Sequence, residues 1–256
     1  MTLYFDHMAA TPLDPRVFAA MRPYFLQPQL SCNHAANHKA GDSVRQVIQD
    51  AKHTILSAVH ATESHDLVFT SGATESINLC LLGIARTYQK QKNHIISFAT
   101  EHSATLMCLQ HLSKSGFEVT ILPVLPSGHI DYELLAQSIQ PNTLLISAVH
   151  VNNEIGVVHN LPHLVQCARD HGTLLHLDCA QSIGKTNLDL SHACADFVSL
   201  SAHKAHGPKG IGALLVRNRP KRKLEPLMYG QSQLNSFRPG TLPTPLIVGM
   251  AAAMCS

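Results

Sequence analysis

The sequence is poor in aromatic and charged residues and contains no tryptophan. Aromatic residues make up 5% and charged residues 14% of the 256 positions, whereas hydrophobic residues make up 45%. Disordered chains have the opposite balance, so this composition predicts a globular protein with a substantial core. The length suits one large domain or two small ones. A net charge of +2 gives no indication of a polyanionic partner such as nucleic acid.

The sequence also lacks the features of secreted and membrane proteins. Its first stretch, MTLYFDHMAATPLDPR, has no basic and apolar leader, and no apolar run approaches the ~20 residues of a membrane span. The seven cysteines are odd in number and form no CxxC pair, which is typical of reduced thiols. The basic stretch at 217–223 has no interleaved aromatics and is typical of a solvated turn. We therefore expect a soluble cytoplasmic protein without membrane or nucleic-acid partners.

The 18 histidines raise the question of a metal site. In CNHAANH, Cys32, His34 and His38 lie close together, and the two histidines would share one face of a helix. Asn33 and Asn37 favour a loop instead, and neither an HExxH motif nor paired CxxC motifs accompany the stretch. We therefore predict no metal site.

Apolar runs alternate with helical patterns along most of the chain. Near-continuous apolar runs indicate strands that helices cover on both faces. The predicted fold is a three-layer α/β/α domain around a mostly parallel sheet. The predicted strands are 66–71, 94–100, 117–124, 143–151, 173–178, 196–201 and 211–216. The predicted helices are 74–89, 103–116, 131–139 and 161–172.

Polar motifs follow five of the predicted strands, namely TSGATES, TEH, HVNNEIG, DCAQS and SAHK. Ligands of parallel sheets bind outside the carboxyl ends of the strands, so we expect these motifs to form one site. TSGATES matches neither GxGxxG nor GxxxxGK[ST], which argues against a nicotinamide or nucleoside triphosphate. The amides of Gly72, Ala73 and Thr74 suit a phosphate at a helix N-terminus, although an ordinary capped helix is the alternative.

Five further side chains of these motifs suit an aldehyde cofactor. Lys204 follows an apolar strand, and a desolvated lysine readily forms a Schiff base, with a surface lysine as the alternative. Asp178 ends a strand, where it could meet a protonated pyridine nitrogen or cap the next turn. His102 could lie over a planar ring or be structural. Asn153 and Gln181 could donate to a phenolic oxygen. Together these groups predict bound pyridoxal 5'-phosphate.

The sequence resembles the cysteine desulfurases, which are pyridoxal-phosphate enzymes of the class V aminotransferase family with the fold-type I architecture. The resemblance extends over essentially all 256 residues, and the shared motifs occur in family order. These motifs are DHMAATPLDPRV, VFTSGATESINL, TEHSAT, HVNNEIGVV, HLDCAQSIGK, SLSAHKAHGPKGIGAL and RPGTLPTPLIVGM.

The resemblance implies a role for each matching residue. It makes Lys204 the lysine that forms the Schiff base and His102 a catalytic residue on the face of the pyridine ring. It implies that Asp178 lies at the ring nitrogen, and that Asn153 and Gln181 lie at the ring oxygen or substrate side. It implies phosphate contacts for four residues of the same subunit and for one residue that reaches across a homodimer interface, namely Ala73, Thr74, Ser201, His203 and Thr241.

The resemblance also implies a reaction and its partners. Cysteine desulfurases convert cysteine to alanine and pass the sulfur through an enzyme cysteine to an acceptor protein, for example in iron–sulfur cluster assembly. Family members extend into a small C-terminal domain, which carries the nucleophilic cysteine and an arginine for the substrate carboxylate. No residue here matches that cysteine, because Cys255 aligns with a helix and Cys179 with a small residue. We expect an N-terminal arm at 1–15, a cofactor-binding large domain at 16–256 and no C-terminal small domain.

Two departures from the family pattern fall near the expected site. YGQSQLNSF at 229–237 replaces a glycine-rich charged segment, and His34 stands where the family usually has proline. Three functions therefore remain open. They are an incomplete cysteine desulfurase, another class V enzyme such as a selenocysteine lyase or an aminotransferase, and a catalytically silent cofactor-binding protein.

Overall fold

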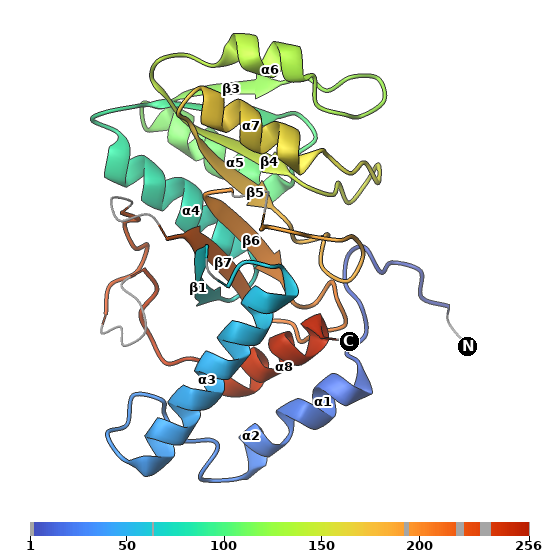
Figure 1. Cartoon of the computed structure of the whole chain (residues 1–256), viewed down its shortest axis with the longest axis vertical. Coiled ribbons are helices and arrows are strands. Elements are labelled where there is room, and N and C mark those ends of the chain that lie inside the picture. Colours follow the sequence, from blue (N-terminus) through green and yellow to red (C-terminus); the bar gives the residue numbers. More distant parts are fainter. Residues whose placement is uncertain (1–2, 63, 192–194, 219–222, 231–236, 256) are drawn as a thin grey trace.

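The computed structural model describes residues 3–62, 64–191, 195–218, 223–230 and 237–255 (Figure 1). Within these residues a seven-stranded sheet has the order β1-β7-β6-β5-β4-β2-β3. Its strands are β1 (His65–Thr70), β2 (His94–Phe98), β3 (Glu118–Leu122), β4 (Thr143–Val149), β5 (Leu174–Asp178), β6 (Phe197–Ser201) and β7 (Gly212–Arg217). The predicted α/β fold is confirmed, and every predicted strand overlaps one of these.

The direction of the strands brings the carboxyl ends of β1 to β6 to one edge of the sheet. Strands β2 to β6 are joined by parallel pairings, from β3 through β2, β4 and β5 to β6. Strand β7 runs antiparallel to both β6 and β1, so β1 again points the same way as β6. The polar motifs that follow β1, β2, β4, β5 and β6 therefore meet at the same edge, as the sequence predicted.

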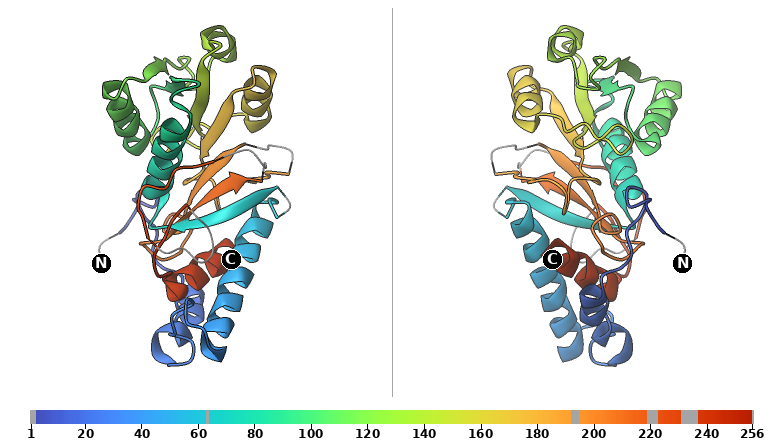
Figure 2. Two further views of the ribbon diagram at one scale, coloured as in Figure 1. Left: turned by 90° about the vertical axis from the view of Figure 1, so that its left-hand side faces the viewer. Right: turned by 90° about the vertical axis from the view of Figure 1, so that its right-hand side faces the viewer.

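Helices cover both faces of the sheet (Figure 2). One face packs on α4 (Ala73–Tyr88) and α5 (Ser103–Lys114), whose buried residues belong to one core cluster. The other face packs on α6 (Tyr132–Ser138), α7 (Leu161–Asp170), α3 (Lys39–Ala58) and α8 (Thr244–Met254). The short helices α1 (Pro15–Met21) and α2 (Pro23–Leu26) contact α8. The four predicted helices correspond to α4, α5, α6 and α7.

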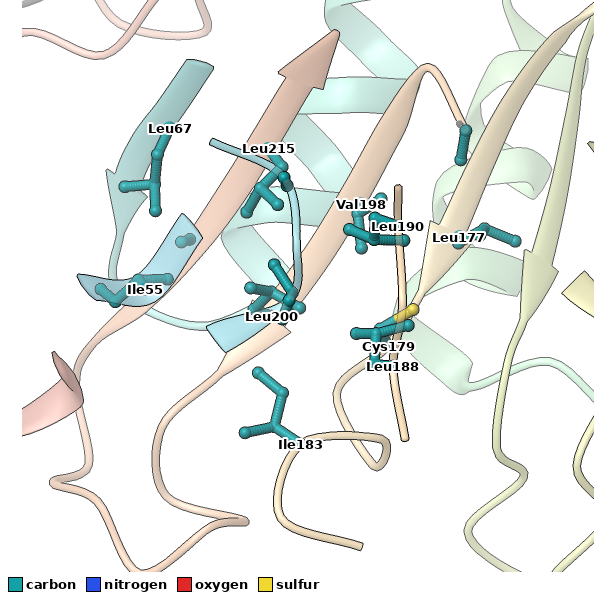
Figure 3. Packing of buried hydrophobic residues seen from close by; sticks show 14 of the residues in the cluster. Ile55, Leu67, Leu177, Cys179, Ile183, Leu188, Leu190, Val198, Leu200 and Leu215 are labelled. Carbon is teal, nitrogen blue, oxygen red and sulfur yellow. The ribbon is translucent and has the colours of Figure 1, made fainter. Parts of the chain in front are cut away.

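The largest core cluster fixes the strands that carry the site. Leu177, Val198 and Leu200, on the neighbouring strands β5 and β6, are fully buried in the same core cluster as Leu215 of β7 and Ile55 of α3 (Figure 3). Burying one such side chain contributes roughly 1.5 to 3 kcal/mol. The strand ends therefore pack on a buried core, which positions the residues that follow each strand.

The histidine-rich stretch CNHAANH forms the loop before helix α3. His38 ends that loop and caps α3, because its Nδ1 accepts a hydrogen bond from the Gly41 amide at 3.4 Å. The predicted loop is thus confirmed. Within the described residues no group of three His, Cys, Asp or Glu side chains is arranged to hold a metal ion. In the same residues, no helix combines the length and apolarity that crossing a membrane requires.

Three features of the sequence fall partly outside the described residues. Residues 219–222 of the basic stretch are outside the described residues. So are residues 231–236 of the segment YGQSQLNSF, which departs from the family pattern. Cys194 is also outside, whereas the other six cysteines are free thiols.

Candidate functional site

A cavity of about 820 Å³ lies at the carboxyl edge of the sheet. Residues after β1, β2, β4, β5 and β6 line it, together with residues of the N-terminal arm. Nine of the ten residues predicted from the sequence line this one cavity: Ala73, Thr74, His102, Asn153, Asp178, Gln181, Ser201, His203 and Lys204. The tenth, Thr241, is exposed to solvent and lies outside it.

The start of α4 presents backbone amides to the cavity. Gly72 is the N-cap of the helix, and its φ is +155°, a backbone conformation that residues other than glycine rarely adopt. No described residue accepts a hydrogen bond from the amides of Ala73 or Thr74. The helix dipole adds positive potential at this end. A Cβ atom on Gly212 would lie 2.7 Å from the Gly72 Cα, so the packing of β7 also requires glycine here.

Lys204 lies in the turn after β6, half-buried at the cavity wall. Among the described residues its ammonium group has no hydrogen-bond or ion-pair partner. Burial lowers the pKa of the Lys204 amine, and the nearby Asp178 carboxylate only partly opposes that effect. A lysine with a lowered pKa supplies the neutral amine that attacks an aldehyde.

Asp178 ends β5 with only 4% of its surface exposed. Its Oδ1 accepts a hydrogen bond from the Ala180 amide at 2.9 Å, so the predicted turn cap exists. Burial raises the pKa of the Asp178 carboxyl, opposed by that amide and by the charges of His102 and Lys204. No described cation forms an ion pair with it. The carboxyl group thus lines the cavity and can still accept a charged partner there.

His102 caps a helix, which is the structural role that the sequence offered, and it also lines the cavity. Its Nδ1 accepts a hydrogen bond from the Ala104 amide at 3.1 Å and so caps α5. In the neutral ring this leaves the proton on Nε2. Because His102 also lines the cavity, a structural bond orients a ring that a ligand can reach.

The turn that carries Lys204 is held by the N-terminal arm. The Thr11 hydroxyl donates to the His203 carbonyl oxygen at 2.9 Å and accepts from the His206 amide at 2.7 Å. Gln181 holds the arm too, since its Nε2 donates to the Met8 carbonyl oxygen at 2.8 Å. These contacts lie on both sides of the lysine and fix the course of its backbone.

Ser201 and His203 form a second pair of polar groups near Lys204. The Ser201 hydroxyl lies 2.9 Å from the Nδ1 of His203. Burial lowers the pKa of the His203 imidazole, and the positive charge of Lys204 lowers it further. His203 therefore favours its neutral form at the cavity wall.

Asn152 shapes the loop that presents Asn153. Its Oδ1 accepts from the amides of Glu154 and Ile155 at 2.9 and 3.1 Å, and its Nδ2 donates to the Thr100 carbonyl oxygen. Asn152 is buried while Asn153 lines the cavity. The residue predicted from the sequence is thus the one that a ligand can contact.

Several residues that line or support the cavity were not among the predicted site residues. Lys209 and Glu75 line it without an assigned role, and Thr11 supports the lysine turn. Glu101, which precedes His102 in the chain, is buried, and its Oε1 accepts from the Val149 amide at 2.7 Å, while burial raises the pKa of its carboxyl. Glu75 and Glu101 belong to motifs already noted, TSGATES and TEH, which was the available signal.

Solved structures share this arrangement of sheet and helices. A NifS-like protein matches it with a TM-score of 0.94 and 34% sequence identity, covering 99% of this chain and 69% of that one. A structure titled "SspA in complex with cysteine" matches with a TM-score of 0.92 and 38% identity, covering 99% and 72%. The chain therefore has the α/β architecture of fold type I.

Within that class the chain belongs to the aminotransferase class-V family, whose sequence profile matches residues 3–255. The cysteine desulfurase IscS of Rickettsia bellii (strain OSU 85-389) is 44% identical over 253 residues. A probable mitochondrial cysteine desulfurase of Dictyostelium discoideum is 41% identical over 251 residues. These matches cover 99% and 98% of this chain but only 61% and 55% of the relatives. The chain thus spans about three fifths of their length.

Proposed function

We propose that this chain is the cofactor-binding part of a pyridoxal-phosphate-dependent cysteine desulfurase. The observation that supports it is the meeting of Lys204, Asp178 and the open N-terminus of α4 around one cavity. Each of these groups lacks an interaction partner that the cofactor would supply. Within the described part of the chain, the Lys204 amine has no partner, the buried Asp178 carboxyl has no cation paired with it, and the amides of Ala73 and Thr74 have no acceptors.

The residues fit the cofactor group by group. Lys204 would hold its aldehyde carbon covalently, and Asp178 would pair with its protonated ring nitrogen. The amides of Ala73 and Thr74, with Ser201 and His203, would bind the phosphate. His102, Asn153 and Gln181 line the same cavity as candidates for the ring face, the ring oxygen and the substrate side. When bound, pyridoxal phosphate supplies an electron-withdrawing ring that stabilises a carbanion.

The remaining steps fall to side chains that move protons. Lys204 and His102 both line the cavity, and each has a nitrogen that can take up and return a proton. Burial lowers the pKa of the Lys204 amine, so its neutral, proton-accepting form is easier to reach than in an exposed lysine. Cysteine is the proposed substrate, because the curated relatives are named cysteine desulfurases.

The described cysteines do not supply the thiolate that such a reaction requires. No cysteine lines the described part of the cavity wall. Cys179 is fully buried beside Asp178, and burial raises the pKa of its thiol. Cys255 is exposed but lines a different hollow between α3 and α8. The lining residues in the described part also include no arginine for a substrate carboxylate. We infer that the part seen here binds the cofactor but needs further residues for sulfur transfer to an acceptor protein.

We further propose a cytoplasmic homodimer. Thr241 is exposed and outside the cavity of its own chain, which suits a residue that reaches a partner's site. The six described cysteines are free thiols, as a reducing compartment favours. Sedimentation of the purified chain tests the dimer directly.

The test of the proposed function is an absorbance titration with pyridoxal phosphate. A yellow absorption band should form, and Lys204→Ala should abolish it. Reduction with borohydride followed by peptide mapping should place the label on Lys204 and not on Lys209. Absence of the band, or a label on Lys209, would reject the proposal.

A second addition distinguishes the alternative functions. Cysteine should change the spectrum of the loaded chain while alanine and sulfide production stays negligible, because no described thiol lines the cavity. Robust turnover that Cys255→Ser removes would contradict this. A response to selenocysteine or to another amino acid alone would favour a different class V enzyme, and no response would favour a silent cofactor-binding protein.

A further inference from the structure

An ion pair joins the start of α4 to a loop 163 residues away. Arg238 Nε lies 3.0 Å from Glu75 Oε1, and both side chains are largely buried, with 22% and 18% of their surface exposed. Arg238 lies three residues before Thr241. The pair therefore ties the loop that carries Thr241 to the first turn of α4.

Glu75 stands between two hollows. It lines the main cavity, and with Ser71 it also lines a neighbouring hollow of about 320 Å³, where Arg238 forms part of the wall. Its second oxygen, Oε2, accepts from the Ser71 amide at 2.6 Å. Burial raises the pKa of the Glu75 carboxyl, but the hydrogen bonds from Ser71 and Arg238 outweigh burial and hold it below the usual value. Glu75 is therefore an ionised carboxylate.

This carboxylate lies in the same helical turn as the open amides of Ala73 and Thr74. A phosphate bound to those amides would experience repulsion from Glu75. The repulsion is strongest at a partly buried site, where solvent screens charges poorly. A cation paired with Glu75 therefore favours anion binding at this turn.

We propose that Arg238 cancels the charge of Glu75 so that the first turn of α4 can accept a phosphate dianion. Glu75 then has a positioning role, since its bond to the Ser71 amide shapes the turn, and Arg238 makes that role compatible with an anionic ligand. The inference rests on the proposed function, because it concerns the phosphate end of the same cofactor site.

The experiment compares three probes: pyridoxal phosphate, pyridoxal without phosphate, and inorganic phosphate. Arg238→Gln should weaken binding of both phosphate-containing probes by about tenfold, within the usual range of coupling between two charges. Pyridoxal binding should stay within about twofold, because it carries no phosphate. Glu75→Gln combined with Arg238→Gln should restore phosphate binding, because the uncompensated carboxylate is gone.

Arg217→Gln is the matched control. Arg217 also has a side chain 22% exposed and pairs with Asp196, but at the opposite end of β7. This variant should lower the melting temperature without changing the affinity for any probe. Melting curves of the Arg238 variants identify any that fail to fold. In that case the test is whether the double variant, Glu75→Gln with Arg238→Gln, binds phosphate.

The outcomes separate this inference from the proposed function. Equal weakening of pyridoxal and pyridoxal phosphate, or a double variant that binds phosphate as poorly as Arg238→Gln, would overturn the inference alone. Binding of inorganic phosphate that depends on Arg238, without any pyridoxal phosphate binding, would support the inference and reject the function. Binding of no probe would reject both.

Discussion

Thr11 and His206 are joined by a hydrogen bond of 2.7 Å from the His206 amide to the Thr11 hydroxyl, two residues beyond Lys204. The same hydroxyl donates to the carbonyl oxygen of His203, immediately before the lysine. One side chain of the arm therefore braces the turn on both sides of the amine. Because Thr11 is buried, water does not compete for these hydrogen bonds.

The first prediction concerns this hydroxyl. Thr11→Val keeps the shape of the side chain but leaves the His206 amide without its acceptor. The free energy of unfolding should therefore fall by about 1 to 3 kcal/mol. The yellow band should also form more slowly, because the amine is held less firmly. Thr11→Ser should retain both properties. Urea denaturation and stopped-flow absorbance measure the two effects.

Thr173 provides the control for Thr11. It is buried just before β5, at the far edge of the sheet, and its hydroxyl has no hydrogen-bond partner among the described residues. Thr173→Val should therefore be neutral or slightly stabilising and should leave cofactor binding unchanged. If Thr11→Val behaved like Thr173→Val, the bracing role would be wrong.

The second prediction concerns Gly72. Its φ of +155° strains any other residue, although a Cβ atom there would meet nothing within 4 Å. Gly72→Ala should destabilise the fold by about 1 to 3 kcal/mol through the backbone alone. The change should also displace the amides of Ala73 and Thr74 and so weaken phosphate binding. Isothermal titration with inorganic phosphate measures the second effect.

Gly116 is the matched position for Gly72. Its φ is +94°, a Cβ atom there also meets nothing within 4 Å, and it follows the C-terminus of α5 away from the cavity. Gly116→Ala should destabilise the fold without any loss of phosphate affinity. Equal loss of affinity in both variants would mean that the effect is global and not local to the α4 turn.

The third prediction concerns the pH dependence of stability. Burial lowers the pKa of His159 to about 4, and neighbouring His129 and His150 add repulsion. The unfolded chain, with a pKa near 6.5, therefore takes up the proton first. Stability should fall as the pH falls from 6.5 towards 4, at ~1.4 kcal/mol per pH unit for each such histidine. Burial also lowers the pKa of His150 to about 4, so it contributes in the same window.

Urea denaturation at several pH values tests this sign. His159→Leu should reduce the slope of stability against pH by about one proton. Thr173→Val removes no titratable group, so it serves as the control and should leave the slope unchanged. A slope of unfolding free energy that is as steep in His159→Leu as in the unmodified chain would exclude His159 as its source.

Local sequence patterns predicted the parts of the fold that depend on neighbours in the chain. The apolar runs that became β4 and β6 are buried at every position, which is why the signal was strong. Nine of the ten predicted site residues line one cavity because they lie at or after strand ends, where the topology of a parallel sheet brings them together.

Other features depend on contacts that no local pattern records. Helix α3 is an exception, because it was not predicted although Val44, Ile48, Ala51 and Ile55 follow a local helical spacing. The antiparallel course of β7 follows from pairing with β1, far away in sequence. The pair of Glu75 and Arg238, like the bonds of Thr11, joins distant segments and needed coordinates.

The distance along the chain between the arm and the lysine turn has a consequence for synthesis. Thr11 and His203 lie 192 positions apart, so the arm emerges from the ribosome long before its acceptor exists. Docking of the arm is a long-range closure, which belongs to the slow class of folding contacts. Under the proposed function, binding of pyridoxal phosphate would therefore follow this late step, because Lys204 lies in the turn that the arm holds in place.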